Sequence, residues 1–225
     1  MRHLLYLEGV TYPARESARR LELIRRYLSP AFTIEMLIPP DGPAILEEPA
    51  HFEQLHRAEL RAVAAVKPDA WGAIIAAGAV DPNLAVLRDA AHVPVIGPGE
   101  ASMFLARILG SRLVILTVGP AVVGAKDLIA HAAVRPEFAT VRPLATTVRQ
   151  ILVDPNTARA LIRKAAAEAA REEKADVLYL GAMTLGTLGI AEELSATLGV
   201  PVIDPIPVAI HVAQAAALAR ADTAV

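Results

Sequence analysis

The sequence predicts an α/β fold of two pseudo-symmetric halves, each a four-stranded parallel sheet flanked by helices, with one cleft between them. Short runs rich in Val, Ile and Leu alternate with longer segments that carry apolar residues at helical spacing. A string from the first half of the chain recurs in the second half. Hydrophobic residues make up 54% of the 225 residues, which is enough to fill a substantial core.

The apolar runs predict eight strands that are buried on both faces, as the strands of a parallel sheet are. Helices are predicted between them. Asp81-Pro82 and Asp154-Pro155 each place an acid before a proline that can open a helix. Gly110 and Gly199 each follow an apolar helix and can end it. The predicted strands are His3 to Leu7, Thr33 to Ile38, Ala73 to Ala77, Val93 to Gly97, Arg112 to Val118, Thr140 to Pro143, Val177 to Gly181 and Val200 to Asp204.

The internal repeat is carried by VPVIGPGEAS from Val93 and VPVIDPIPVA from Val200, which begin 107 residues apart. In each half, an aspartate leads into the predicted strand that comes before this string. These residues, Asp69 and Asp176, are also 107 residues apart. The first strands of the two halves are offset by a similar amount. Duplication of one βαβαβαβ unit therefore accounts for the pattern better than chance similarity does.

Each half is expected to form its own lobe, with residues 1–97 and 206–225 in the first and residues 98–205 in the second. In open parallel sheets, ligands bind beyond the carboxyl ends of the strands, where helix N-termini and irregular turns gather. Two such halves facing one another would share one site. We expect it to be lined by the turns after four strands, which end at Leu7, Ala77, Val118 and Gly181.

Composition favours a small-molecule ligand and argues against other partners. The net charge of -2 and the scattered Arg and Glu give no basic stripe for nucleic acid. Uncharged stretches are shorter than the roughly 18 residues of a membrane span. The apolar start ends at Glu8 without a cleavage site, so we expect a cytoplasmic protein with no membrane partner. The apolar helix from Pro207 to Ala219 predicts a homo-oligomer.

The chain contains no cysteine, which excludes disulfides, thiolate metal sites and thiol nucleophiles. No pair of histidines has metal-ligand spacing with an acid. The string GPAVVGAK from Gly119 fails as a phosphate-binding loop, because Asp127 stands where such loops have Ser or Thr. We therefore expect no metal and no cofactor.

Several strings follow one another along nearly the whole chain: GPAILEEP from Gly42, DPNLAVLRD from Asp81, VPVIGPGEA from Val93, LGSRLVILT from Leu109, and ADVLYLG followed by LGVPVIDP. Their order and spacing resemble the hydantoin racemase branch of the aspartate/glutamate/hydantoin racemase superfamily. The resemblance implies the α/β fold, an isomerase of the racemase or epimerase type that needs no cofactor, and a dimer or larger assembly.

The resemblance also implies where the chemistry of this family would lie. Its members place one cysteine in each half just after the third strand, where this chain has Ala77 and Ala182. In the family one thiolate removes a proton from the substrate carbon and the other thiol returns one, which two methyl groups cannot do. Three explanations stay open: an introduced double substitution, natural divergence, and transfer of the proton chemistry to other residues.

Three residues are predicted to take over the proton transfer. Glu8 ends the first strand, near the place of a substrate-holding Asn in the family, and is otherwise a solvated acid. In the cleft, its carboxylate would repel an acidic substrate and accept hydrogen bonds from the N–H groups of a cyclic ureide or amide. Asp81 is either a base or a helix cap, and Thr184 lies two residues beyond the second missing thiol.

The predicted substrate-binding residues lie in the same turns. The threonines can supply hydroxyl and backbone donors to a carbonyl or carboxylate, or can serve turn geometry alone. Tyr12 could serve as an acid if its pKa were lowered. The set consists of Thr11, Tyr12, Gly78, Thr117, Val118 and Met183.

These residues favour isomerase-type proton transfer next to a carbonyl, on a small cyclic ureide or amino-acid derivative, by a thiol-independent route. One alternative is a hydrolase or lyase that acts on a related small molecule. Another is a non-catalytic small-molecule binder that has lost racemase activity. Exchange of the α-proton with solvent would separate the first function from the other two.

Overall fold

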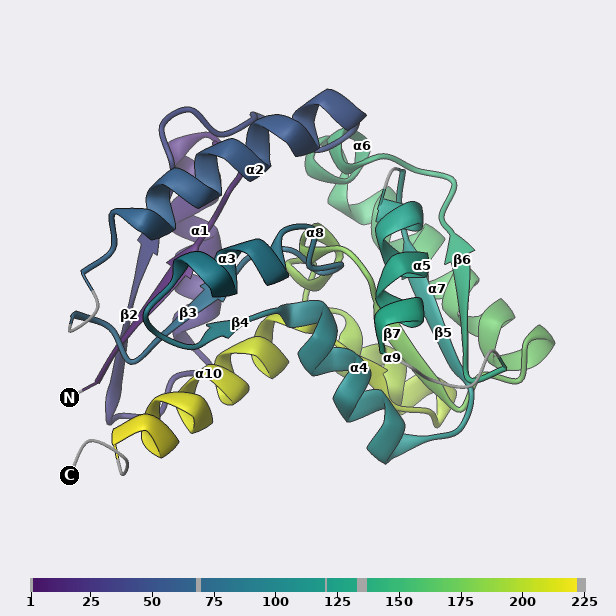
Figure 1. The fold of residues 1–225 in the computed structure, drawn as a ribbon. Coiled ribbons are helices and arrows are strands. Elements are labelled where there is room, and N and C mark those ends of the chain that lie inside the picture. Colours follow the sequence, from purple (N-terminus) through teal and green to yellow (C-terminus); the bar gives the residue numbers. More distant parts are fainter. Residues whose placement is uncertain (1, 68–69, 120, 133–136, 222–225) are drawn as a thin grey trace. The chain divides into compact units, whose positions relative to one another are not determined.

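The computed structural model describes residues 2–67, 70–119, 121–132 and 137–221 of the chain. They form an α/β fold with two four-stranded parallel sheets, each flanked by helices (Figure 1). All eight predicted strands are present. Asp69 of the predicted repeat lies outside the described residues. Within these ranges, no helix combines the length and the apolar character needed to cross a membrane.

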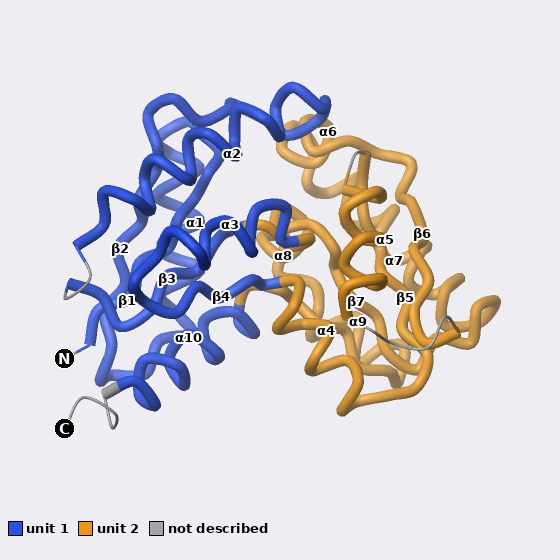
Figure 2. The backbone as a smooth tube through the Cα atoms, viewed as in Figure 1, with its two compact units in different colours: residues 1–77, 81–98, 207–225 blue, residues 78–80, 99–206 orange. Residues whose placement is uncertain are grey.

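The chain divides into two compact units (Figure 2). Unit 1 consists of residues 1–77, 81–98 and 207–225, and unit 2 of residues 78–80 and 99–206. Neither unit is one continuous stretch of chain. Each unit is therefore held together by contacts between segments that are distant in sequence.

The sheet of unit 1 has the strand order β2-β1-β3-β4, and all neighbouring strands are parallel. Side chains of β1 and β3, such as Leu5 and Ile74, pack with those of α2 and α3 on one face. Leu4 and Tyr6 on the other face are also buried, which leaves that face to α1 and α10. The elements are β1 (Arg2–Leu7), α1 (Ala14–Arg25), β2 (Phe32–Leu37), α2 (Pro49–Ala64), β3 (Ala73–Ala76), α3 (Leu84–Ala90), β4 (Val95–Ile96) and α10 (Pro205–Ala221), whose first two residues belong to unit 2.

The sheet of unit 2 has the equivalent order β6-β5-β7-β8, again with parallel neighbours. One face packs against α6, α7, α8 and α9, with Ile162 and Leu194 among the buried side chains. The elements are α4 (Pro98–Leu109), β5 (Leu113–Thr117), α5 (Ala121–His131), β6 (Ala139–Pro143), α6 (Val148–Val153), α7 (Pro155–Glu172), β7 (Val177–Leu180), α8 (Met183–Gly186), α9 (Ala191–Leu198) and β8 (Val202–Ile203).

The two sheets share one register between their first and third strands. In unit 1 the last pair is Leu7 with Ala76, and in unit 2 it is Leu116 with Leu180. The next hydrogen bond is also equivalent, because the N–H of Ala77 donates to Leu7 and that of Gly181 donates to Leu116. In register, therefore, Ala182 has Gly78 and not Ala77 as its counterpart. Continuing this register by one or two residues matches Glu8 with Thr117, Ala77 with Gly181, and Gly78 with Ala182.

The predicted helix ends are confirmed at α7 and α9 and wrong at α3. Asp154 caps α7, since its side chain accepts a hydrogen bond from the Thr157 N–H at 3.0 Å. Gly199 ends α9 in the left-handed conformation, with φ of 68°. Asp81 does not cap α3, which begins at Leu84. Asp81 has φ of 50°, and an N-cap residue is normally extended.

Candidate functional site

A buried acid lies at the carboxyl end of β1 in unit 1. Glu8 follows the last residue of this strand and is only 2% exposed. Its N–H donates to the carbonyl of Leu37 at 2.9 Å, which holds it at the end of the sheet. Ala77 occupies the neighbouring position beyond β3, because β1 and β3 are paired up to the preceding residue of each. An acid therefore lies next to one of the residues that stand where thiols were expected.

The carboxyl group of Glu8 has incomplete partners. Its Oε2 lies 3.6 Å from Nη1 of Arg20, but this buried oxygen has no hydrogen-bond partner among the described residues. Burial raises the pKa of Glu8 to about 7, although Arg20 and a hydrogen bond from the Val10 backbone oppose the increase. Near neutral pH both protonation states of Glu8 are populated, which is the requirement for a general acid or base.

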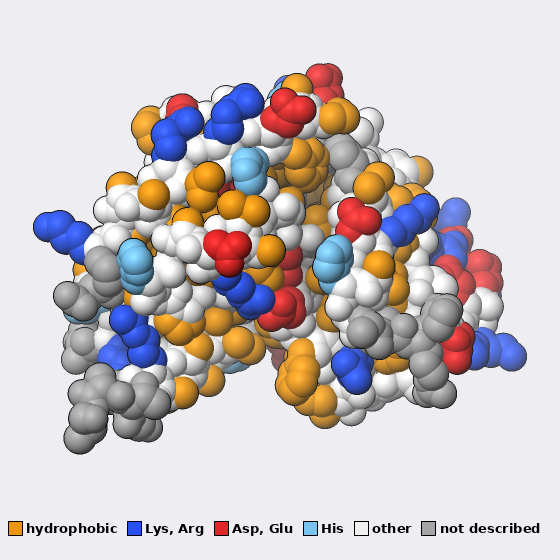
Figure 3. Space-filling view, in the orientation of Figure 1, with side chains coloured by type: hydrophobic (Ala, Val, Ile, Leu, Met, Phe, Trp, Pro, Cys, Tyr) orange, Lys and Arg blue, Asp and Glu red, His pale blue; other side chains and the backbone are white. Residues whose placement is uncertain are grey.

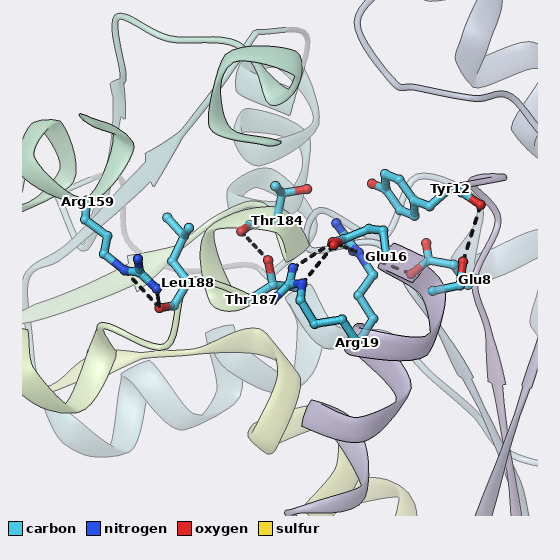
Figure 4. Close-up of polar contacts among 10 residues, drawn as sticks. Glu8, Tyr12, Glu16, Arg19, Arg159, Thr184, Thr187 and Leu188 are labelled. Atoms are coloured by element: carbon cyan, nitrogen blue, oxygen red, sulfur yellow. Dashed lines mark hydrogen bonds and ion pairs between the residues drawn. The ribbon is translucent and has the colours of Figure 1, made fainter. Parts of the chain in front are cut away.

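Arg20 is only loosely engaged with Glu8 because other residues hold its guanidinium group. Glu16 accepts a hydrogen bond from Nε of Arg20 at 2.9 Å and another from Arg19 at 2.7 Å (Figure 4). Although burial alone would raise the pKa of Glu16, the hydrogen bonds from Arg19 and Arg20 lower it overall. The ring of Tyr12 stacks on Arg20, with 3.9 Å from the guanidinium carbon to the ring centroid. Tyr12, predicted to contact substrate, thus has one ring face against this arginine.

A second buried acid in unit 1 was not predicted from the sequence. Glu59 of α2 is 3% exposed, and its Oε2 accepts a hydrogen bond from Asn83 at 2.6 Å. Burial raises the pKa of Glu59 to about 7; Asn83 lowers it and the charge of Glu8 adds to the increase. The signal was available, because Glu59 shares the buried face of α2 with Leu55 and Val63 at helical spacing.

The predicted candidate Asp81 lies elsewhere in unit 1. It is half-buried in the segment between β3 and α3. A Cβ atom on Gly97 would lie 2.6 Å from its Oδ2, so the carboxyl group packs against the backbone after β4. Asp81 thus bridges the ends of the third and fourth strands of its sheet and does not cap a helix.

The strand ends of unit 2 carry hydroxyl groups that serve the backbone. Thr117 is fully buried, and its hydroxyl donates to the carbonyl of Gly181 at 2.7 Å. Thr187 donates its hydroxyl to the carbonyl of Thr184 at 2.8 Å (Figure 4). Thr184 is itself buried in α8. The methyl group of Ala182 packs against the core of this unit.

Other predicted binding residues are also engaged inside their own units. Thr11 donates its hydroxyl to Gly42 at 3.2 Å, and its N–H donates to Pro43 at 2.8 Å. Both donors of Thr11 are therefore used within unit 1. Gly78 belongs to a short segment of unit 2 whose next residue, Ala79, accepts a hydrogen bond from the Tyr179 hydroxyl at 2.5 Å. Val118 and Met183 of unit 2 are both buried.

Asp204 is a buried acid of unit 2 that the sequence did not single out as functional. It directly precedes α10, and its Oδ1 accepts a hydrogen bond from the Ile206 N–H at 2.8 Å. Burial raises the pKa of Asp204 to about 6. This geometry is that of a helix cap, so Asp204 has a structural role at the start of α10.

The distribution of charged side chains bears on the binding of macromolecules and metal ions. Figure 3 shows basic and acidic side chains interspersed on the visible face. Within the described part of the chain, no three His, Asp or Glu side chains come together in a way that could hold a metal ion.

Comparison with known proteins finds relatives of this chain. A family model described as Asp/Glu/Hydantoin racemase matches residues 18–215. A hydantoin racemase of Paenarthrobacter aurescens is 30% identical over 187 residues, which are 80% of this chain and 77% of that enzyme. A hydantoin racemase of Pseudomonas sp. (strain NS671) is 28% identical over 185 residues, 78% of this chain and 70% of that enzyme.

Solved structures agree with the sequence comparisons. The allantoin racemase of Pseudomonas fluorescens matches 98% of this chain and 92% of its own, with a TM-score of 0.86 and 28% identity. An allantoin racemase from Klebsiella pneumoniae covers 98% of this chain and 89% of its own, with a TM-score of 0.87. At 21% identity, the second likeness shows the fold alone.

Proposed function

Because this chain belongs to the Asp/Glu/hydantoin racemase family, we propose that it moves a proton on and off a carbon next to a carbonyl group, by a route that uses no thiol. Racemases among its relatives make it an isomerase of the racemase type. The proposed substrate is a small cyclic ureide or a related amino-acid derivative. Glu8 is the group that we propose in place of a family thiol.

The observation that carries this proposal is the state of the Glu8 carboxyl group. Glu8 is 2% exposed, lies at the carboxyl end of the central strand β1, and has one oxygen without a hydrogen bond among the described residues. Its pKa of about 7 matches the range in which a general base is effective at neutral pH. Buried acids with a shifted pKa concentrate at functional sites, although structural ion pairs also perturb pKa values.

The proposed step balances as a proton transfer without any co-reactant. The carboxylate of Glu8 takes the proton from the substrate carbon, and the electron pair of the C–H bond moves into the neighbouring carbonyl to give an enolate. A proton returned to the carbon regenerates a substrate or its mirror image, and Glu8 loses its own proton to solvent. Asp81 and Thr184 remain the candidates predicted from the sequence for the group that returns the second proton.

The charge of unit 1 supports an uncharged substrate. Glu8 and Glu59 are both buried acids, and their mutual repulsion contributes to the raised pKa of Glu59. A substrate carboxylate placed near them would add a third negative charge to a poorly hydrated region. A cyclic ureide avoids this cost, because its N–H groups can donate hydrogen bonds to carboxylate oxygens.

The test is hydrogen exchange at the substrate carbon in heavy water. Purified protein is incubated with a panel of 5-substituted hydantoins, allantoin and free amino acids, and loss of the α-proton is followed by NMR together with optical rotation. We expect exchange above the protein-free blank for cyclic ureides, accompanied by loss of optical rotation. Glu8→Gln should remove the exchange, while Glu35→Gln, an exposed acid on β2, should retain it.

Three outcomes would overturn the proposal. One is the absence of exchange across the whole panel. Another is formation of a ring-opened or eliminated product without deuterium incorporation, which would indicate a hydrolase or lyase. The third is a rise in the unfolding temperature with ligand but no turnover, which would indicate a non-catalytic binder.

A homo-oligomer is part of the proposal. Val212 and Leu218 of α10 are exposed by 39% and 44%, respectively, which leaves apolar surface on this helix. Light scattering at several protein concentrations tests the expectation of a dimer or a larger assembly. A monomer at all concentrations would contradict it.

A further inference from the structure

The proposed proton transfer makes no use of a bridge of three side chains in unit 1. Nδ1 of His56 and Oδ1 of Asn83 lie 3.0 Å apart. The Nδ2 of Asn83 donates to Oε2 of Glu59 at 2.6 Å. The bridge links the half-buried His56 to the buried Glu59, which both come from α2, through a residue that follows β3.

The bridge determines which oxygen of the Glu59 carboxyl group is already hydrogen-bonded. Since the carboxylate of Glu59 can only accept, the amide nitrogen of Asn83 faces it, and Oδ1 of Asn83 then faces Nδ1 of His56, which donates in the matching tautomer. Oε2 is thereby committed as an acceptor of the Asn83 amide. Oε1 makes no hydrogen bond among the described residues.

The open oxygen lies beside the turn that follows β1. A Cβ atom on Gly9 would be 2.5 Å from Oε1 of Glu59, so only a glycine allows this carboxyl group to approach the turn. Gly9 directly follows Glu8, the proposed base. The open acceptor of Glu59 therefore lies at the ligand-binding edge of the sheet, next to the backbone of the proposed site.

We propose that Glu59 is a specificity-determining residue, which accepts a hydrogen bond from an N–H group of a ring-closed ureide and disfavours ligands that carry a carboxylate. His56 and Asn83 are positioning residues that keep Oε1 turned toward the ligand. This inference rests on the proposed function for its substrate class. It goes further by assigning recognition to Glu59 and proton transfer to Glu8.

The first experiment uses two ligands that differ by ring closure. 5-Methylhydantoin and N-carbamoylalanine contain the same carbon skeleton, but hydrolysis of the ring adds a carboxylate and turns the imide N–H into a urea NH2 group. We expect the wild-type protein to bind the closed ring at least about tenfold more tightly by calorimetry at pH 7.5. Equal affinity for the two ligands would overturn the inference.

Glu59→Gln is the decisive variant because the bridge dictates the orientation of the new amide. The N–H of Asn83 requires the oxygen of the glutamine, so the NH2 group is turned to the position of Oε1. An acceptor facing the ligand becomes a donor. We expect affinity for 5-methylhydantoin to fall about tenfold or more and affinity for N-carbamoylalanine to rise. Glu53→Gln, which alters an exposed acid of the same helix, should bind like the wild type.

Asn83→Asp tests the positioning role with a readout that fold stability alone does not move. The new carboxylate beside Glu59 should raise the pKa of Glu59, because like charges disfavour ionisation and the amide donor is lost. We expect the pH at which 5-methylhydantoin affinity is half-maximal to increase by about one unit or more. An unchanged midpoint would overturn the assignment of Asn83, and Glu59→Asp serves as a second variant if Glu59→Gln does not fold.

The outcomes separate this inference from the proposed function. If the wild type binds the closed ring selectively and Glu59→Gln abolishes that selectivity, the inference holds even when no α-proton exchange occurs. If the wild type exchanges the α-proton but Glu59→Gln leaves both affinities unchanged, the inference is wrong while the proposed function stands.

Discussion

Glu8 of unit 1 and Thr117 of unit 2 occupy equivalent positions in the two sheets, but their side chains differ in hydrogen bonding. Each is the residue that follows the last position at which its central strand pairs with the third strand of the same sheet. Both are buried, at 2% and 0% exposure. The hydroxyl of Thr117 is satisfied by the carbonyl of Gly181, whereas Oε2 of Glu8 has no hydrogen-bond partner among the described residues. One position reinforces the backbone and the other keeps an unsatisfied acid.

This difference is the reason for placing the proposed chemistry in unit 1. A buried polar atom without a partner costs free energy, so it persists where it has a use. Around Glu8, the neighbouring segments add Arg20, Glu16 and Glu59, all charged side chains with restricted exposure. In unit 2, Thr117 at the corresponding strand end and Thr187 at the end of α8 donate to carbonyl groups. Unit 1 is therefore the half on which we place acid–base chemistry and ligand recognition.

The largest effect is expected from removing the acid of this pair. Glu8→Gln keeps the shape but cannot accept a proton, so kcat/KM for α-proton exchange should fall by about 10²–10⁴-fold. Steady-state kinetics with the best cyclic ureide from the panel measure the loss. Glu35→Gln on the neighbouring strand is the control. Near-wild-type kinetics for Glu8→Gln would place the proton transfer elsewhere.

The second effect concerns stability and its dependence on pH. The pKa of Glu8 is raised from 4.5 to about 7, so as pH rises the unfolded chain releases this proton first. The contribution of the Glu8 proton to the free energy of unfolding is complete below a pH of about 4.5. It is lost as the pH rises through 7, a loss of roughly 3 kcal/mol. Glu8→Gln should escape this loss, and urea unfolding at pH 4.5 and pH 8 measures it. An identical pH dependence in both proteins would mean that Glu8 titrates normally.

The third effect concerns Thr117, the residue of the pair whose hydroxyl is hydrogen-bonded. Thr117→Val keeps the side-chain shape but leaves the carbonyl of Gly181 without its donor, at a cost of about 2 kcal/mol in the free energy of unfolding. Urea unfolding at a single pH is sufficient. Thr140→Val, at an exposed position of the neighbouring strand β6, should stay close to the wild type. A destabilisation no larger than that of Thr140→Val would remove the contrast with Glu8.

The smallest expected effect is a gain of thiol-dependent activity. The register matches Ala182 with Gly78, so Gly78→Cys with Ala182→Cys should restore exchange in the Glu8→Gln background by about tenfold. Alkylation with iodoacetamide should abolish the gain. Ala77→Cys with Ala182→Cys is the matched comparison, and higher activity of that pair would show that the loop after β3 shifts the expected position.

The strands could be predicted from the sequence because apolar runs and the repeat mark their positions along the chain without any knowledge of side-chain contacts. The eight strands and the caps at Asp154 and Gly199 are confirmed for this reason. Asp81 was predicted to be either a base or a helix cap; its left-handed φ and the start of α3 at Leu84 exclude the cap. The division into lobes stays a prediction.

The site was less accessible to sequence reasoning. Glu8 could be singled out because it directly follows an apolar strand. Glu59 was missed although its helical spacing with Leu55 and Val63 predicts a buried position, because its partners Asn83 and Gly9 are distant in sequence. Hydrogen bonds of Thr11 and Thr117 to carbonyl groups were equally invisible. Roles assigned to the predicted residues remain predictions.

The most direct test of an acid in place of a thiol is the pH profile of α-proton exchange. For the wild type, kcat/KM should rise with pH and level off above about 7, which is the pKa of Glu8. Glu8→Asp should keep an inflection, and Glu8→Gln should show low activity without one. A wild-type profile with no inflection between about pH 5.5 and about pH 8.5 would contradict the central claim that Glu8 carries the proton.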